Sequence, residues 1–259
     1  MTTHHNILLA CMAKSGSTYL RAIISGLPNF RIASWVPGHG RREQELCKDT
    51  IIKELCGYPN SNQIAQLHVR YSDVTERYVQ EFELKPVVLV RNILDVIPSL
   101  LDHHKSESTT HPFAYVPKNI VDWDNNRAAE FTTNMIIPWY LNFYASWNNC
   151  EEKVLLCYED LIKNPKDVIK KICSKWNIQV SDDEILHAIK RAAGMNTRMN
   201  IGQPGRGASV SNYCKQHILK LASYYEDVDF SIIGIGKKEN SSQRFYLSDI
   251  ENSNGVEKC

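Results

Sequence analysis

Lysine and hydroxyl residues gather where the first apolar run of the chain ends. The run Asn6–Cys11 has the composition of a buried strand, and Ala13-Lys14-Ser15-Gly16-Ser17-Thr18 follows it closely. This order predicts a strand, a tight loop with a lysine, and a helix that begins at two hydroxyl residues. Backbone N–H groups, a helix N-terminus and the Lys14 ammonium would then converge, as in a phosphate or sulfate site. The alternative is an ordinary strand–helix turn with a solvated lysine. The spacing is not Walker A, because Lys14 precedes the Ser-Gly pair.

An arginine ends a second apolar run. Val87–Val90 is apolar throughout, as expected for a central parallel strand, and Arg91 follows it. A side chain at the carboxyl end of a parallel strand faces the crevice where α/β proteins bind ligands. The Arg91 guanidinium suits bidentate phosphate contact, and Ser99 on the following helix adds a hydroxyl donor. Taken alone, pairing with Asp95 explains Arg91 equally well; together with the Lys14 loop, the pattern predicts a ligand charged at two ends.

The elements that must position these side chains alternate between short apolar runs and amphipathic stretches. This alternation predicts an α/β fold, a single domain with a central, mostly parallel sheet flanked by helices. We expect strands at Asn6–Cys11, Arg31–Trp35, Ile64–Val69, Val87–Val90 and Val154–Tyr158. We expect helices at Asp73–Phe82, Thr133–Trp147, Lys166–Trp176 and Ile185–Ala193.

Single residues refine this layout. Ser181 with Glu184 predicts a capping box before the last of these helices, and Pro138 predicts a kink in the second. Ser106–Asn126 is polar, with two prolines and little periodicity, which predicts a long loop or lid. We expect one domain over residues 1–237, followed by a polar tail, 238–259, that is partly flexible.

Composition excludes several classes of protein. The net charge of +1 provides no general basic field, so we expect no nucleic-acid partner. The first apolar run is too short for a secretory signal or a membrane span. Eight cysteines form no Cys-x-x-Cys pair, which favours a reducing compartment. We therefore expect a cytoplasmic protein without a membrane span; the sequence does not indicate its oligomeric state.

The motifs resemble those of the PAPS-dependent sulfotransferases, whose donor carries a 5′-phosphosulfate and a 3′-phosphate. Met12–Tyr19 is similar to their 5′-phosphosulfate loop, usually Pro-Lys-Ser-Gly-Thr-Thr-Trp, with Tyr19 replacing the tryptophan expected to stack on adenine. Arg91-Asn92-x-x-Asp95-Val96-x-x-Ser99 matches their 3′-phosphate motif at every defining position. Cys157–Leu161 resembles their Tyr-Glu-Asp-Leu segment, whose tyrosine, here Tyr158, lies near the nucleotide base.

A fourth segment resembles the family more loosely. Arg206–Tyr213 is similar to the late Arg-Lys-Gly-x-x-Gly-Asp-Trp loop over the 3′-phosphate, but Gly207 and Ala208 stand where Lys-Gly is usual. One phosphate contact is therefore in doubt there. The resemblance covers about residues 6 to 215.

The resemblance implies a P-loop-NTPase-like sulfotransferase architecture, with PAPS as donor, PAP as product and no required metal. It implies in-line transfer of a sulfuryl group to a hydroxyl or amine of a small-molecule or carbohydrate acceptor. Lys14 would stabilise the leaving phosphate. The residues implied to bind the donor are Lys14, Ser15, Gly16, Ser17, Thr18, Tyr19, Arg91, Ser99, Tyr158, Arg206 and Gly207.

The general base is predicted to be His68. It stands where the Lys-x-His segment of the family falls, with Gln66 in place of the lysine, and an imidazole suits proton removal near neutral pH. In the alternative, His68 is a hydrogen-bonded histidine at a strand end without a catalytic role, and Glu43 or Glu45 is the base. His39, His103 and His104 are weaker candidates, expected to line the acceptor pocket or to be solvated.

Two other functions remain open from the sequence. A non-catalytic protein would bind PAP or another nucleotide without transferring sulfate. A P-loop kinase-like phosphotransferase would require Mg²⁺ and a Gly-Lys-Ser/Thr arrangement, and the chain lacks that arrangement.

Overall fold

The computed structural model describes residues 4–37, 44–111, 113–195 and 203–236. The chain divides into two units, one from Met1–Val90 with Ser146–Gly202 and one from Arg91–Ala145 with Gln203–Cys259. Predictions that concern His39, Glu43 and the tail 238–259 lie outside the described residues.

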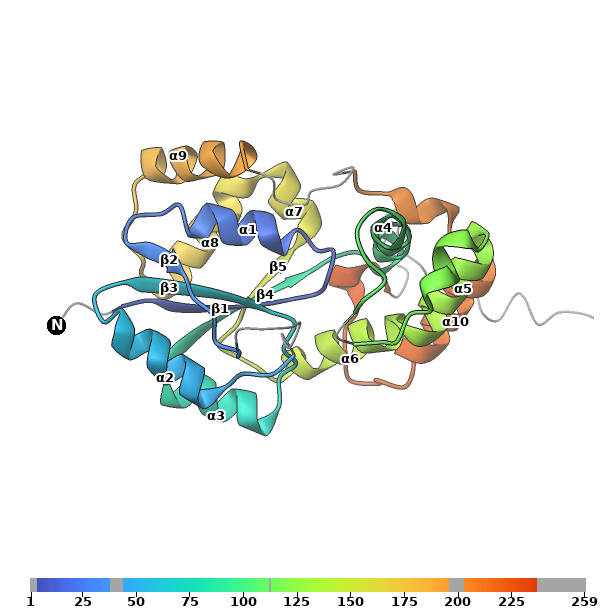
Figure 1. Ribbon diagram of the computed structural model, residues 1–259, viewed down its shortest axis with the longest axis horizontal. Helices are drawn as coiled ribbons and strands as arrows, with labels where there is room; N and C mark the ends of the chain where they lie inside the picture. Colours follow the sequence, from blue (N-terminus) through green and yellow to red (C-terminus); the bar gives the residue numbers. More distant parts are fainter. Residues whose placement is uncertain (1–3, 38–43, 112, 196–202, 237–259) are drawn as a thin grey trace, which may run out of the picture. The chain divides into compact units, whose positions relative to one another are not determined.

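The first unit contains a five-stranded sheet in the order β2-β3-β1-β4-β5 (Figure 1). Each neighbouring pair is parallel, so the predicted α/β class is confirmed and the described sheet is parallel throughout. The strands are β1 (Asn6–Cys11), β2 (Phe30–Ile32), β3 (Asn62–Leu67), β4 (Leu84–Val90) and β5 (Val154–Cys157). β2 is shorter than the predicted Arg31–Trp35, although the Ala33 amide still donates to the Ile64 carbonyl at 2.9 Å.

Helices cover both faces of this sheet. Figure 1 shows α1 (Ser17–Ile24), α8 (Pro165–Trp176) and α9 (Asp182–Ala193) on one face. On the other face lie α2 (Lys48–Gly57) and α3 (Asp73–Glu81). Alternate strand residues, including Ile7, Leu9, Cys11 and Ile64, are buried with residues of α1, α8 and α9 in one core cluster. Because strand side chains alternate with a period of two, Gln66 lies on the same face as Ile64, toward α1.

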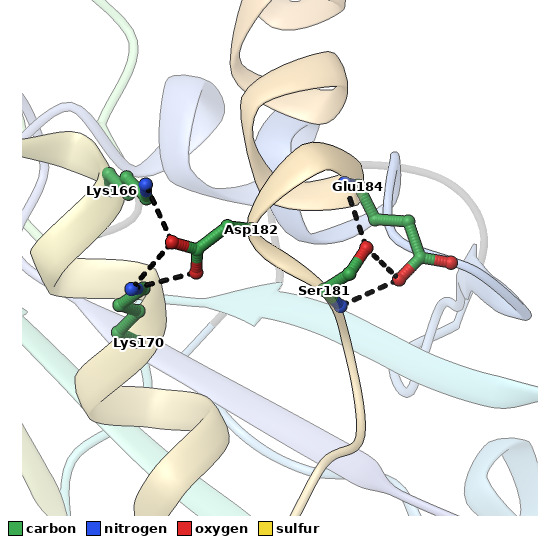
Figure 2. Close-up of polar contacts among 5 residues, drawn as sticks. All are labelled: Lys166, Lys170, Ser181, Asp182 and Glu184. Atoms are coloured by element: carbon green, nitrogen blue, oxygen red, sulfur yellow. Dashed lines mark hydrogen bonds and ion pairs between the residues drawn. The ribbon is translucent and has the colours of Figure 1, made fainter.

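The start of α9 is held by side chains (Figure 2). The predicted capping box is confirmed: the Ser181 hydroxyl accepts from the Glu184 amide, and the Glu184 carboxylate accepts from the Ser181 amide at 2.7 Å. The Asp182 carboxylate pairs with Lys166 at 2.8 Å and with Lys170 at 2.7 Å. These contacts join α8 to α9 over the sheet.

The second unit is helical. Its elements include α4 (Ile93–Ser106), η1 (Lys118–Asp122), α5 (Asn125–Met135), η2 (Arg206–Ser209), α10 (Asn212–Ala222) and η3 (Ser231–Ile233). The chain returns to the first unit within α6 (Ile137–Asn148), and α7 (Tyr158–Lys163) follows β5. Within the described ranges, no helix has both the length and the apolar character needed to span a membrane.

Two predictions about this unit are wrong in part. The predicted helix Thr133–Trp147 is two helices that part at Ile136, with Pro138 in the first turn of α6, where a missing N–H breaks no helical hydrogen bond. The predicted loop Ser106–Asn126 contains the short helix η1 and the first residues of α5, which Asp124 caps by accepting from the Arg127 amide at 3.0 Å.

His5, at the start of β1, makes the stability of the fold depend on pH. Burial, then the Lys85 ammonium, then His4 lower the pKa of His5 from 6.5 to about 4. Its Nδ1 atom lies 2.8 Å from Lys85 Nζ, which can donate only to a neutral ring. The unfolded chain therefore binds the proton more tightly, and the free energy of unfolding should fall as the pH drops from 6.5 toward 4. Urea unfolding at several pH values measures this slope. The slope should be reduced in His5→Gln, and an equal slope in both proteins would contradict this account.

Candidate functional site

The loop after β1 has a strained backbone. Lys14 has a φ of 62° and Gly16 a φ of 80°, both in the left-handed region that favours glycine. The Ser15 side chain is fully buried, and its hydroxyl donates to the Met12 carbonyl at 2.6 Å. The Ser15 hydroxyl therefore holds the loop, which leaves its backbone amide as the group that can face a ligand.

The loop opens directly into α1. Gly16 is the N-cap of this helix, and without a side chain it gives the first turn no side-chain cap. The first amides of a helix have no partner within the helix and attract an anion. A Cβ on Gly16 would lie 2.9 Å from Cδ2 of Tyr158, which is buried against the loop. The structure thus brings Tyr158 and the Lys14–Thr18 loop together, as the sequence predicts.

His68 lies beside the start of the same loop. It follows β3, the neighbour of β1, and its Nδ1 atom is 2.8 Å from the Cys11 carbonyl oxygen. A carbonyl only accepts, so Nδ1 carries a proton, and in a neutral ring the lone pair then lies on Nε2. This tautomer lets Nε2 accept a proton, which is what a general base must do.

The order of the strands marks the carboxyl ends of β1 and β4 as a ligand crevice. From β1 the chain runs to β2 at one edge of the sheet, and from β4 it runs to β5 at the other. Neighbouring strands whose connections diverge in this way form the crevice in which open α/β sheets bind ligands. The Met12 amide donates to the Leu89 carbonyl at 3.0 Å, so the Lys14 loop begins beside the end of β4. Arg91 is bonded to Val90, the last residue of β4.

In the second unit, a carboxylate fixes the loop before α10. Asp95, in the first turn of α4, is buried, and its two oxygens accept from the amides of Gly205 and Gly207, both at 2.6 Å. The Gly207 amide, which the sequence assigned to the donor, is therefore occupied by Asp95. A carboxylate of the chain itself thus holds this amide, and a role of Gly207 in donor binding stays a prediction.

Gly207 packs directly on the backbone of α4. A Cβ on Gly207 would lie 2.4 Å from Leu94 Cβ and 2.6 Å from the Leu94 carbonyl carbon. Gly207 is thus a position where a side chain would collide with helix backbone. The Arg206 guanidinium forms an ion pair with the Asp102 carboxylate at 2.7 Å, which ties this loop to α4.

We expect Gly207→Ala to lower the free energy of unfolding by about 1–3 kcal/mol, because the added methyl group overlaps backbone that cannot yield. Gly57→Ala is the matched control, since a Cβ there meets no atom within 4 Å and alanine is favoured near a helix end. Urea unfolding of both variants provides the comparison. Equal stabilities would show that the 203–209 loop is not packed as described.

Comparison with known proteins decides the family. The model of the sulfotransferase domain matches residues 4–201, which is most of the chain. The chain belongs to the sulfotransferase family. The resemblance inferred from the motifs is thereby confirmed. None of the curated proteins compared with this sulfotransferase matches it.

Solved structures agree on the fold. A mouse sulfotransferase complexed with PAP is similar to this sulfotransferase with a TM-score of 0.64 and 17% identity, over 87% of this chain and 85% of that one. A retinol dehydratase in complex with androsterone and inactive cofactor PAP has a TM-score of 0.54 and 12% identity, over 87% and 82%. The complex of retinol dehydratase with retinol and PAP has a TM-score of 0.53 and 13% identity, over 89% and 84%. At these identities the likeness establishes the fold.

The other residues predicted to bind the donor or to act as the base differ in their burial. Tyr19 is 7% exposed and belongs to the core cluster under α1, and burial raises the pKa of its phenol. Little of its ring is therefore open to an adenine, and its stacking role stays a prediction. Arg91 and Ser99 are both buried in the second unit. Glu45 is exposed, and its role as the alternative base stays a prediction.

Histidine and aromatic side chains of α4, of the segment after it and of α6 form a cluster. His104 is buried, and its Nε2 atom is 2.6 Å from Nε2 of His111. The expectation that His104 is solvated is therefore wrong. The His111 ring lies 5.1 Å from Phe113, which stacks on Trp139 at 4.6 Å between ring centroids. Phe113 and Trp139, which lie far apart in the sequence, are thus brought together.

Sequence reasoning missed two positioning side chains. Asp95 was recognised only as a motif residue or a partner of Arg91, although the two glycines near Arg206 were a signal that an anion could be bound by their amides. Gln66 was recognised only as a replacement for lysine, although its strand parity places it on the face of α1. In the structure it donates to the Ser17 hydroxyl at 2.9 Å.

Proposed function

We propose that this sulfotransferase moves a sulfuryl group from PAPS to a hydroxyl or amine of a small-molecule acceptor. The observation that carries the proposal is the uncapped N-terminus of α1, with the Lys14 loop, at the crevice between the ends of β1 and β4. The amides there have no side-chain cap, and Gly16 lets a ligand approach the backbone closely. A phosphosulfate group fits these donors in charge and in hydrogen bonding.

Each end of the donor has candidate partners. We assign its 5′ end to Lys14 and to the amides of Ser15–Thr18, and its 3′-phosphate to Arg91 and Ser99. The assignment of the 3′-phosphate rests on the Arg91-Asn92-x-x-Asp95-Val96-x-x-Ser99 motif of the sequence. The Arg91 guanidinium offers two parallel N–H groups, which match two oxygens of a phosphate.

Transfer requires charge stabilisation and proton removal. Lys14 would stabilise the negative charge that develops on the bridging oxygen as the sulfuryl group leaves. His68 would accept the acceptor proton on Nε2, while its Nδ1–H bond to the Cys11 carbonyl orients the ring. A lone pair of the acceptor oxygen or nitrogen would form the new bond to sulfur as the bond from sulfur to the bridging oxygen breaks, and that bonding pair would leave with the oxygen of PAP.

The acceptor is proposed to be apolar. The stacked rings of Phe113 and Trp139, both partly exposed, offer a surface that suits a hydrocarbon or aromatic skeleton. The retinol and androsterone found in similar structures are apolar alcohols, which supports this class. A carbohydrate acceptor is the second class to test, since the sequence favours neither.

Radiolabelled PAPS with a panel of apolar alcohols, amines and glycans tests the proposal, in EDTA and without added metal. We expect label in an acceptor product and release of one PAP for each sulfate transferred. Binding of PAP with no transfer to any acceptor would favour a binding protein instead. Transfer of phosphate from ATP that requires Mg²⁺ would favour a kinase.

A further inference from the structure

The Gln66 side chain contacts the helix that the donor is proposed to face. Gln66 lies near the end of β3, and its Nε2 atom donates to Oγ of Ser17 at 2.9 Å. Ser17 is the first residue of α1, directly after the Gly16 N-cap, and is 6% exposed. A side chain of the sheet thus holds a hydroxyl at the uncapped end of the helix.

This contact determines where the Ser17 proton can point. A hydroxyl has one donor hydrogen and two acceptor lone pairs, and the Gln66 amide fills one lone pair. In the part of the chain that the structure describes, the Ser17 hydroxyl has no acceptor for its own proton. A buried O–H group without an acceptor is unfavourable, so the site lacks one acceptor that a bound phosphate oxygen would provide.

The carbonyl oxygen of the Gln66 side chain indicates that this glutamine does not contribute to the stability of the fold. Its Oε1 atom is buried and has no hydrogen-bond partner among the described residues. Leaving a buried polar atom unsatisfied lowers stability, and an apolar side chain of similar size would avoid that penalty. A residue that costs stability at the edge of a binding site is expected to serve the site.

We propose that Gln66 is a positioning residue for the donor: it orients the Ser17 hydroxyl so that its proton points to the 5′-phosphate oxygens. The inference rests on the proposed use of PAPS and adds a residue to that site. Glutamine and lysine side chains both carry an N–H donor, so either could donate to the Ser17 hydroxyl. The chemistry that matters is therefore an N–H donor at this position.

Three substitutions at residue 66 separate this role from others. Gln66→Leu removes the donor and should weaken PAP binding about tenfold, the loss of one hydrogen bond to a charged group. Gln66→Lys keeps a donor and should bind PAP within about threefold of the parent protein. Gln66→Glu offers only acceptors, so its carboxylate would accept the hydrogen bond from the Ser17 hydroxyl and would repel phosphate. The loss of PAP affinity should therefore be larger than in Gln66→Leu.

The measurement is calorimetric titration with PAP and, as the matched ligand, adenosine 3′-phosphate, which lacks the 5′ group. The substitutions should weaken PAP binding and leave adenosine 3′-phosphate binding unchanged. In a Ser17→Ala background, Gln66→Leu should cause no further loss, because the role acts through that hydroxyl. The melting temperature of Gln66→Leu should equal or exceed that of the parent protein.

Different outcomes overturn different claims. If the parent protein does not bind PAP, the proposed donor is wrong, and this inference with it. If the parent binds PAP and Gln66→Leu binds it equally well, the positioning role alone is wrong. Tight PAP binding by Gln66→Glu together with weak binding by Gln66→Lys would mean that the Ser17 hydroxyl donates to residue 66. That result would also overturn the positioning role. Should Gln66→Leu fail to fold, the Lys and Glu variants still decide the question.

Discussion

Lys14→Ala should nearly abolish sulfuryl transfer. The ammonium is proposed to contact the phosphosulfate in the ground state and to stabilise the leaving oxygen in the transition state. Loss of one such contact costs about 10²–10³ in kcat, and PAP binding should weaken by about tenfold or more. Steady-state kinetics with PAPS, together with PAP titration, measures the two effects separately.

The backbone at Lys14 calls for a control, because a left-handed φ of 62° is strained for any residue with a Cβ. Lys14→Gly removes the ammonium and relieves the strain, so it should be at least as stable as Lys14→Ala and equally inactive. Lys14→Arg retains a positive charge and should keep part of the affinity for PAP. Recovery of activity in Lys14→Gly would mean that loop geometry, not charge, explains the lysine.

His68→Ala should lower kcat by about 10²–10⁴ while PAP binding stays nearly unchanged. The reason is that Nε2 of the neutral ring is the proposed proton acceptor, whereas the donor contacts lie in the Lys14 loop. Pre-steady-state transfer to a fixed acceptor, with PAP affinity measured in parallel, tests both halves of this expectation.

His68→Asn is the matched control for a structural role. The Asn amide N–H can replace Nδ1–H as the donor to the Cys11 carbonyl, but its side chain cannot accept a proton at neutral pH. If His68 is the general base, the His68→Asn variant should transfer sulfate as slowly as His68→Ala. If Asn restores activity, the hydrogen bond to Cys11 is what matters, and a carboxylate such as Glu43 or Glu45 must be the base.

The parts of the fold with strong local signals were predictable. β1 has the predicted limits, because five consecutive buried apolar residues after Asn6 lead directly into a lysine loop, as a central parallel strand would. The starts of α3 and α9 follow Ser72 and Ser181, and each hydroxyl accepts from the backbone amide three residues further along the chain. In contrast, α2 has only Ile51 buried and no side-chain cap, so little in its sequence indicates a helix.

The candidate site was predictable at the level of motifs and less so at the level of contacts. Proximity of His68 to the Lys14 loop followed from two parallel strands that end at one edge of the sheet. The contact of Asp95 with Gly205 and Gly207 joins residues more than a hundred positions apart in the chain, which no local pattern reveals. The burial of Tyr19 likewise depends on tertiary packing, because an aromatic side chain one turn into a helix can face either a ligand or the core.

The central claim is that the Lys14 loop and Arg91 bind opposite ends of one donor, and calorimetry with three nucleotides tests it most directly. PAP, adenosine 5′-phosphate and adenosine 3′-phosphate would be titrated into the parent protein, Lys14→Ala and Arg91→Ala. We predict that the parent binds PAP more tightly than either monophosphate, that Lys14→Ala loses the gain from the 5′-phosphate, and that Arg91→Ala loses the gain from the 3′-phosphate. If PAP binds no more tightly than the better monophosphate, or if both variants lose the same phosphate, the two residues do not share one donor.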